Sequence, residues 1–282
     1  MFHALVNAPL CPLFSRPVQD SSRADEALYG MPLEILEQLP GGWCKVLTHY
    51  GYTGFGRQED LLVSPDAALW SAREKRVVLR QNFCDVLSEP RYQARVLLTL
   101  PRGALLVPEG QAREGWQPVR LWDGGGGFVR ESLLGEAYDA PPPLPQAQLR
   151  KRLQETGLLY AGTQYRWGGK TPLGIDCSGL TFMIYLLSGI VIWRDAQLRE
   201  GYPVHEIPMS RLARGDLLYF SGHIAMYMEN GLYLHSTGAA GSDGVTVNSL
   251  DPASPLYRAD LAGSLLQAGS VFPLPEEQEH FS

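Results

Sequence analysis

The residue best suited to chemistry is Cys177, because it begins an apolar segment that predicts a helix over residues 177–189. The free backbone N–H groups and the positive end of a helix dipole favour an anion at this position, so the sequence predicts a thiolate. A buried structural cysteine is the alternative role for a lone thiol, and we expect it for Cys11, Cys44 and Cys84. Cys177 is therefore the candidate nucleophile.

A cysteine nucleophile needs a general base, and the base needs a group that orients it. Two of the six histidines, His223 and His235, follow Cys177 on consecutive predicted strands and are twelve residues apart. A single histidine in a strand is usually a structural residue. Two of them on paired strands, downstream of a cysteine at a helix start, favour a catalytic pair.

The turn between the two strands must bring His223 and His235 to one face of the sheet. Side chains alternate between faces along a strand, so a regular hairpin with residues 230–231 as its two-residue loop puts the rings on opposite faces. A three-residue loop, residues 229–231, puts His235 opposite Ala225 on the His223 face, and a bulge elsewhere in the hairpin serves equally. We therefore predict an odd loop or a bulge, with the two rings within hydrogen-bonding reach.

An internal repeat organises the N-terminal half. Residues spaced 73 apart are identical in two segments, namely Gly30, Gly42, Trp43, Val46, Gly54, Phe55 and Arg57 with Gly103, Gly115, Trp116, Val119, Gly127, Phe128 and Arg130. Two copies are too few for a solenoid, so we expect two homologous domains, residues 1–68 and 72–138. Short apolar runs bounded by Gly and Pro predict small all-β barrels.

A third domain is expected beyond a proline-rich segment. Four prolines in residues 139–145 predict a stiff linker. The domain that follows, residues 146–282, should open with a helix over 146–160 and contain strands at 217–220, 224–228 and 232–236.

Composition excludes several classes of protein. The net charge of −6 argues against nucleic-acid binding and, weakly, against anionic membranes or wall polymers. No apolar run is long enough to span a membrane. No CxxC pair is present, so we do not expect a zinc site. We also expect no other metal site and no cofactor. We expect a monomer with free cysteines in the cytoplasm, since prolines interrupt the N-terminal segment where a secretory leader would lie; removal of a leader would instead imply export.

Four segments resemble the NlpC/P60 family of cysteine peptidases in type and order. They are DCSGL at 176–180, RGDLLYF at 214–220, GHIAMYM at 222–228 and YLHST at 233–237. The pattern shared by the two N-terminal repeats resembles the bacterial SH3 domain. The resemblance implies two small all-β SH3-like barrels followed by a papain-like α+β cysteine peptidase domain.

This combination of domains resembles the γ-D-glutamyl-L-diamino acid endopeptidases, which cut murein peptides between D-Glu and diaminopimelate or L-Lys. The resemblance implies a murein tripeptide or tetrapeptide as substrate, a free N-terminal L-Ala and a role in cell-wall recycling. It leaves the diamino acid open. Two alternatives remain: a wall-binding SH3-like protein with a degenerate catalytic domain, and a related thiol amidase or acyltransferase.

The resemblance also implies a role for each residue of the motifs. Cys177 is the nucleophile, His223 the base and then the acid, and His235 the orienting group. Tyr165 matches a tyrosine near the oxyanion, which its phenol and the Cys177 backbone N–H would stabilise. Trp167 matches an aromatic residue of the site wall, with core packing as its alternative role.

Substrate contacts are implied at five further positions. Asp176 and Ser178 flank the nucleophile, where Asp176 would hold a substrate ammonium, or cap the helix, or do both. Asp195 is a second candidate for the ammonium, with a loop cap as its alternative; it lies in a segment similar to an Arg-Asp-Ser loop, in which Ala196 here lacks the hydroxyl. Either Tyr50 or Tyr52 would close the site from the first barrel, or serve only as a barrel residue.

Overall fold

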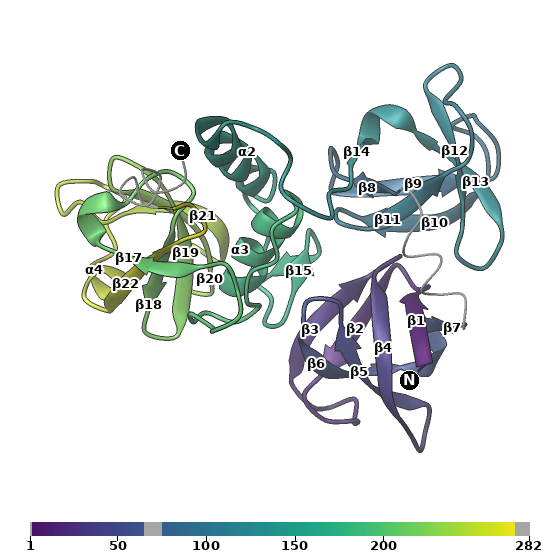
Figure 1. Cartoon of the computed structure of the whole chain (residues 1–282), viewed down its shortest axis with the longest axis horizontal. Helices are drawn as coiled ribbons and strands as arrows, with labels where there is room; N and C mark the ends of the chain where they lie inside the picture. The colour runs from purple at the N-terminus through teal and green to yellow at the C-terminus, as the bar shows by residue number, and fades with distance from the viewer. Residues whose placement is uncertain (1, 65–74, 274–282) are drawn as a thin grey trace, which may run out of the picture. The chain divides into compact units, whose positions relative to one another are not determined.

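The computed structural model describes residues 2–64 and 75–273 (Figure 1). The chain divides into two compact units. The first is Met1–Ala137 with Trp167–Leu173, and the second is Tyr138–Arg166 with Gly174–Ser282. The seven residues that come shortly before the nucleophile therefore belong to the first unit. The expected boundary between the N-terminal domains, residues 68 to 72, lies outside the described residues, and the domain limits stay a prediction.

The first unit contains two seven-stranded antiparallel sheets with one topology. Their strand orders are β3-β2-β6-β5-β4-β1-β7 and β10-β9-β13-β12-β11-β8-β14, so each strand of the second takes the place of its counterpart in the first. The 73-residue repeat is thus also a repeat of fold. The strands are β1 Phe2–Val6, β2 Leu10–Phe14, β3 Arg23–Leu28, β4 Pro32–Leu39, β5 Trp43–Thr48, β6 Thr53–Arg57 and β7 Leu61–Val63, then β8 Arg76–Val78, β9 Phe83–Leu87, β10 Val96–Pro101, β11 Leu105–Pro108, β12 Trp116–Arg120, β13 Gly126–Arg130 and β14 Leu134–Glu136, with short 3-10 helices η1 Gln58–Asp60 and η2 Glu131–Leu133.

The repeated residues make the same contacts in both sheets. The guanidinium of Arg57 lies 4.9 Å from the Trp43 ring centroid, and that of Arg130 lies 5.0 Å from the Trp116 ring centroid. Each arginine also donates to a backbone carbonyl in the turn before its tryptophan, at 2.8 and 3.1 Å. These cation–π pairs explain why Trp and Arg recur together at this spacing.

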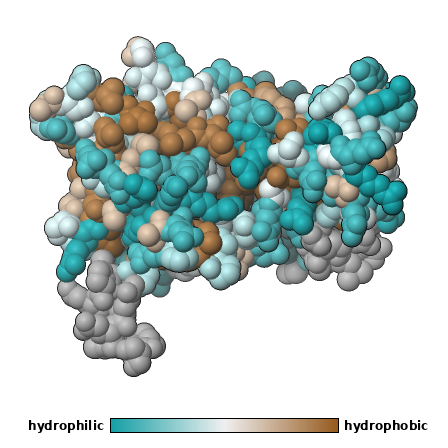
Figure 2. All heavy atoms as spheres, turned by 90° about the horizontal axis from the view of Figure 1, so that it is seen from above, coloured by the Kyte–Doolittle hydropathy of each residue, from teal (hydrophilic) through white to brown (hydrophobic). Residues whose placement is uncertain are grey.

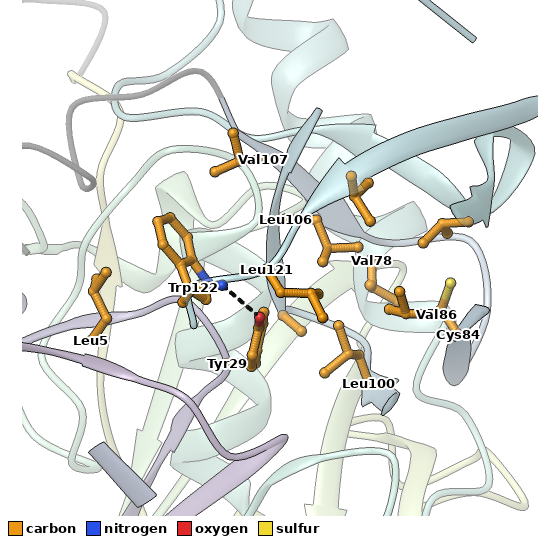
Figure 3. Close-up of a cluster of buried hydrophobic side chains, with 13 residues drawn as sticks. Leu5, Tyr29, Val78, Cys84, Val86, Leu100, Leu106, Val107, Leu121 and Trp122 are labelled. Carbon is orange, nitrogen blue, oxygen red and sulfur yellow. Dashed lines mark hydrogen bonds between the residues drawn. The ribbon is translucent and has the colours of Figure 1, made fainter. Parts of the chain in front are cut away.

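The two sheets share a hydrophobic core rather than standing as independent barrels. Tyr29, from the first repeat, is fully buried among side chains of the second (Figure 3). Its hydroxyl accepts the Trp122 backbone N–H at 3.1 Å, and its carbonyl accepts the Leu105 N–H at 2.9 Å. The next residue, Gly30, has φ +82°, and a Cβ there would lie 2.6 Å from the Leu105 oxygen. Only glycine permits this approach.

The second unit is built around a six-stranded sheet with the order β17-β22-β18-β19-β20-β21 (Figure 1). Helix α3 packs against β19 and β20, and α2 packs against α3. The elements are α2 Gln146–Leu158, β16 Gly174–Ile175, α3 Cys177–Leu186, β17 His205–Ile207, η3 Met209–Arg211, β18 Leu217–Phe220, β19 His223–Glu229, β20 Leu232–Thr237, β21 Gly244–Ser249, α4 Ala259–Ala262 and β22 Leu265–Ser270; β15, Lys170–Thr171, belongs to the first unit.

Two features of the sequence fix helix α2 to the sheet. A Cβ on Gly157 would lie 2.6 Å from a methyl group of Leu234, so the missing side chain lets the helix come close. The buried Asp216, in the RGD turn before β18, accepts from Arg150 of α2 at 2.8 Å and from the Ser270 hydroxyl at 2.6 Å. The expected helices and strands are present, but α3 ends three residues before the predicted limit of 189 because the chain turns at Gly189, whose φ is +74°.

The molecular surface seen in Figure 2 mixes hydrophilic residues with areas where hydrophobic residues gather. Within the described residues, no helix combines the length and the apolar character needed to cross a lipid bilayer.

Candidate active site

The β19–β20 hairpin contains the predicted bulge. Its loop is Asn230–Gly231, with Glu229 paired to Leu232, so the three-residue loop is wrong. The register shifts between Tyr227 and Glu229, and this shift restores the alternation that a two-residue loop would otherwise break. Positive φ values at 230 and 231, +52° and +76°, suit an Asn-Gly turn. The bulge therefore turns both histidines to one face.

The two histidine rings are hydrogen-bonded, as the sequence predicts. Nε2 of His223 lies 2.8 Å from Nδ1 of His235, and the rings meet edge to face at 87°. The second nitrogen of His235, Nε2, lies 2.8 Å from Oδ1 of Asn248 on β21. Burial, and after it the charge that His235 would carry, lowers the pKa of His223 to about 3, and burial lowers the pKa of His235 to about 4. Both imidazoles are thus neutral near pH 7.

Cys177 lies at the first residue of α3 and is almost fully buried. Its sulfur accepts a hydrogen bond from the backbone N–H of Ile224, the residue after His223. The structure does not support the expected thiolate: burial, and after it the neighbouring Asp176 carboxylate, together raise the pKa of Cys177 to about 11. The helix N-terminus does not offset the loss of solvation. A protonated thiol beside a neutral imidazole needs the imidazole as a general base.

The protonated thiol has a consequence for alkylation. We expect the rate at which iodoacetamide modifies Cys177 to rise continuously from pH 6 to beyond pH 9, because only the thiolate reacts and its fraction grows throughout this range. Peptide mapping by mass spectrometry measures the rate at this residue separately from the other cysteines. A rate that reaches a plateau below pH 8 would show a preformed thiolate–imidazolium pair and contradict the raised pKa.

Tyr165 lies close to the nucleophile. Its ring packs against Gly238, and its pKa is raised to about 12 by burial and by the charges that Cys177 and Asp176 would carry. The phenol is therefore protonated and is a hydrogen-bond donor at neutral pH. This is the property that stabilisation of an oxyanion requires.

Asp176 and Ser178 are held by a buried arginine that sequence reasoning did not select. The Asp176 carboxylate caps α3 by accepting the Gly179 N–H at 2.6 Å, as the capping alternative predicts. Arg194, only 1% exposed, donates to Asp176 at 3.2 Å and to the Ser178 hydroxyl at 2.7 Å. Arg194 already neutralises the Asp176 carboxylate, and the role of Asp176 toward a substrate ammonium stays a prediction. Asp195, the other candidate, follows Arg194 and is half-buried.

Three of the candidate substrate contacts belong to the first unit. Trp167 is 69% exposed, so its alternative role in core packing is wrong. Tyr52 is half-buried. Tyr50 is buried, and its hydroxyl donates to Asp25. The roles of these three residues toward a substrate stay predictions.

A buried lysine explains the environment of Tyr50. Lys170 is fully buried, and its ammonium lies 3.0 Å from Asp25 and 4.3 Å from the centroid of the Tyr50 ring. Its backbone N–H donates to the buried Glu26 at 2.9 Å. A buried ammonium needs such partners to offset its desolvation. The interaction ties the segment Trp167–Leu173 to the first barrel, which the sequence did not indicate.

The orienting role of His235 leads to a comparison of two variants. His235→Ala removes the acceptor for the His223 ring N–H, and we expect kcat to fall by about a hundredfold. His235→Asn retains a carbonyl that accepts this N–H, so its loss should be roughly tenfold smaller than that of the alanine variant. Steady-state kinetics on both proteins measures the difference, and equal losses would contradict the orienting role.

All four cysteines are free, as expected. Burial raises the pKa of Cys84 to about 12, and it also raises the pKa values of Cys11 and Cys44. Within residues 2–64 and 75–273, no group of three or more His, Cys, Asp and Glu side chains is placed to hold a metal ion.

Comparison with known proteins assigns both types of domain. Residues 162–259 match the NlpC/P60 family, and residues 12–61 match the bacterial SH3 domain. The chain is 40% identical over 273 residues to dipeptidyl-peptidase 6 of Lysinibacillus sphaericus, which covers 96% of this chain and 100% of that protein. It is 28% identical over 266 residues to a gamma-D-glutamyl-L-lysine dipeptidyl-peptidase of Bacillus cereus, covering 85% of this chain and 73% of the relative.

A solved structure shows the same fold. The crystal structure of an NlpC/P60 family protein from Bacillus cereus superposes with a TM-score of 0.79 at 21% identity, covering 96% of this chain and 100% of the other. The SH3-like sheets followed by an α+β domain, as predicted, thus form a known architecture. With a relative of 40% identity aligned over its whole length and both domain types matched, the chain belongs to the NlpC/P60 family of cysteine peptidases.

Proposed function

We propose that this protein hydrolyses the γ-D-glutamyl–L-diamino acid bond of short murein peptides and releases the N-terminal dipeptide L-Ala-γ-D-Glu. The observation that carries the proposal is the hydrogen-bonded pair of His223 and His235, whose ring nitrogens Nε2 and Nδ1 are 2.8 Å apart. The residue after His223, Ile224, contacts the Cys177 thiol through its backbone N–H. The names of the two relatives, a dipeptidyl-peptidase and a gamma-D-glutamyl-L-lysine dipeptidyl-peptidase, support the bond and the released product.

The proposed first step forms a thioester. The Cys177 sulfur attacks the γ-carbonyl carbon of D-Glu while its proton passes to the neutral imidazole of His223. The carbonyl oxygen becomes an oxyanion, and the Tyr165 phenol and the Cys177 backbone N–H are the proposed donors to it. His223 then gives its proton to the amine of the diamino acid as the C–N bond breaks, and this amine leaves as the first product.

The second step regenerates the thiol. Water enters where the amine has left, and His223 removes a proton from it as the water oxygen attacks the thioester carbon. The C–S bond breaks, the sulfur recovers the proton from His223, and the dipeptide leaves with a γ-carboxyl group, which releases its proton to solvent. His235 keeps the imidazole in place through both transfers.

The substrates are proposed to be released tripeptides and tetrapeptides in wall recycling rather than intact wall. The net charge of −6 supports this choice, because it disfavours tight binding to an anionic polymer. Asp195 is the proposed partner of the free L-Ala ammonium, since it is half-buried and the other candidate, Asp176, is already paired with the buried Arg194.

The test offers the full-length protein a panel of substrates and identifies products by mass spectrometry. L-Ala-γ-D-Glu-L-Lys and its diaminopimelate counterpart are compared with their N-acetylated forms, with purified sacculi and with an acyl ester. We expect L-Ala-γ-D-Glu and the free diamino acid from at least one unblocked peptide, and much slower cleavage once the amine is acetylated. Binding to sacculi without cleavage would favour the wall-binding alternative, and acyl transfer without hydrolysis would favour the acyltransferase.

A further inference from the structure

Asn248 extends the line of hydrogen bonds that begins at His223. It lies on β21 and is 8% exposed, with Oδ1 2.8 Å from Nε2 of His235 and Nδ2 3.0 Å from the backbone oxygen of Leu256. We propose that Asn248 is a positioning residue that sets the tautomers of both histidines and thereby selects the nitrogen of His223 that serves as the base. The inference deepens the proposed function, since it concerns the same histidine pair.

The hydrogen bond from Asn248 to the backbone oxygen of Leu256 determines which atoms donate and which accept in the whole series. A backbone carbonyl can only accept, so the side chain of Asn248 must turn its NH₂ group toward Leu256 and its oxygen toward His235. The Leu256 oxygen is itself held, because it also accepts the Ser249 N–H at 2.9 Å. A hydrogen bond also holds the segment between Ser249 and Leu256 in place. The Leu250 N–H donates to the Gly231 oxygen, in the β19–β20 turn, at 2.8 Å.

The orientation of Asn248 then determines the proton on each ring. An amide oxygen accepts, so Nε2 of His235 carries hydrogen, and its Nδ1 in the neutral ring is an acceptor. His223 Nε2 must therefore be the donor of the 2.8 Å bond, which leaves Nδ1 of His223 without a proton. Nδ1 is then the nitrogen that takes the thiol proton. With the opposite tautomer of His235, its bare Nε2 would face the Asn248 oxygen, and two acceptors would meet with no hydrogen between them.

A purely structural amide would make a different prediction. If Asn248 only satisfied buried polar groups, its removal would lower stability without changing which ring nitrogen carries the proton. The charged residues that act on both rings, Arg258 and Asp260, form an ion pair at 2.6 Å and stay in every variant. A change in tautomer after substitution at 248 therefore reports on the amide itself.

The experiment records nitrogen NMR of full-length protein labelled with ¹⁵N-histidine, together with kcat and KM. Asn248→Leu removes both hydrogen bonds, Asn248→Asp keeps an acceptor for His235, and Thr246→Val is a matched control on the same strand, opposite His235. In the wild type and the control, we expect both rings to show a protonated Nε2 and a bare Nδ1. In Asn248→Leu, we expect a mixture of tautomers at His235 and a fall in kcat of about tenfold to a hundredfold, with KM nearly unchanged.

Asn248→Asp keeps the test decisive if the leucine variant does not fold. Its carboxylate still accepts from Nε2 of His235, so the wild-type tautomers and more of kcat than in the leucine variant should remain. Wild-type ring signals in a folded Asn248→Leu protein, or loss of the Nε2 proton in Asn248→Asp, would overturn the proposal. The NMR readout needs no substrate, so a failure of the proposed substrate assignment would be seen separately, in the product analysis.

Discussion

Cys177→Ala should abolish peptide hydrolysis, with kcat falling by roughly 10⁴-fold or more. The Cys177 sulfur forms the only covalent bond proposed between the protein and the substrate, and alanine has no nucleophilic atom in place of this sulfur. The fold should persist, because alanine occupies less space and leaves the Asp176 cap of α3 in place. Product release measured by mass spectrometry, with circular dichroism as the check on folding, provides the test.

The matched control for this variant is Cys84→Ala. Cys84 is also a free buried thiol with a raised pKa, but it lies in the core of the first unit. We expect it to retain nearly wild-type kcat, with some loss of stability from the cavity. If Cys177→Ala retains a tenth of wild-type turnover, the assignment of the nucleophile is wrong.

His223→Ala should be nearly as damaging, with a fall in kcat of roughly 10³-fold or more at pH 7. The reason is the protonated thiol: with a Cys177 pKa of about 11, a site without its base holds very little thiolate. The residual activity of the variant should therefore rise about tenfold for each pH unit between 7 and 9, as the thiolate fraction does. The wild type should rise far less, because His223 is already unprotonated throughout this range.

His205→Ala is the corresponding histidine control. His205 begins β17, at the edge of the same sheet, and should leave both kcat and its pH dependence unchanged. A His223→Ala protein whose activity is as flat with pH as that of the wild type would show that the thiol does not depend on this imidazole.

The sequence alone was enough to predict that His223 and His235 lie on one face of the hairpin, because this requirement involves only two neighbouring strands and their turn. Strand alternation alone required a bulge or an odd loop between His223 and His235, and the structure has the bulge. The sequence could not distinguish the bulge from the three-residue loop, because Asn230–Gly231 is compatible with either turn. The repeat also predicted two related sheets, but not that Tyr29 would enter the core of the second, since packing between domains leaves no periodic signal.

The residues that were missed, or assigned the wrong state, depend on tertiary burial. Nothing local in the sequence indicates that Arg194 and Lys170 are buried, and only the folded chain shows that each lies against carboxylates. Asn248 is a single polar residue in a short strand, and nothing near it in the sequence relates it to His235. The thiolate predicted at Cys177 failed because the helix terminus is a local feature, whereas desolvation comes from the whole surrounding structure.

The most direct test of the proposed chemistry is to trap the acyl-enzyme. Full-length protein is mixed with excess L-Ala-γ-D-Glu-L-Lys or its diaminopimelate counterpart, quenched in acid during the first turnover, digested and mapped by mass spectrometry. The account predicts that the L-Ala-γ-D-Glu acyl group is found on the peptide that contains Cys177, and that it is absent from the Cys177→Ala protein. Acylation of a different residue, or an acyl group that retains the diamino acid, would contradict it.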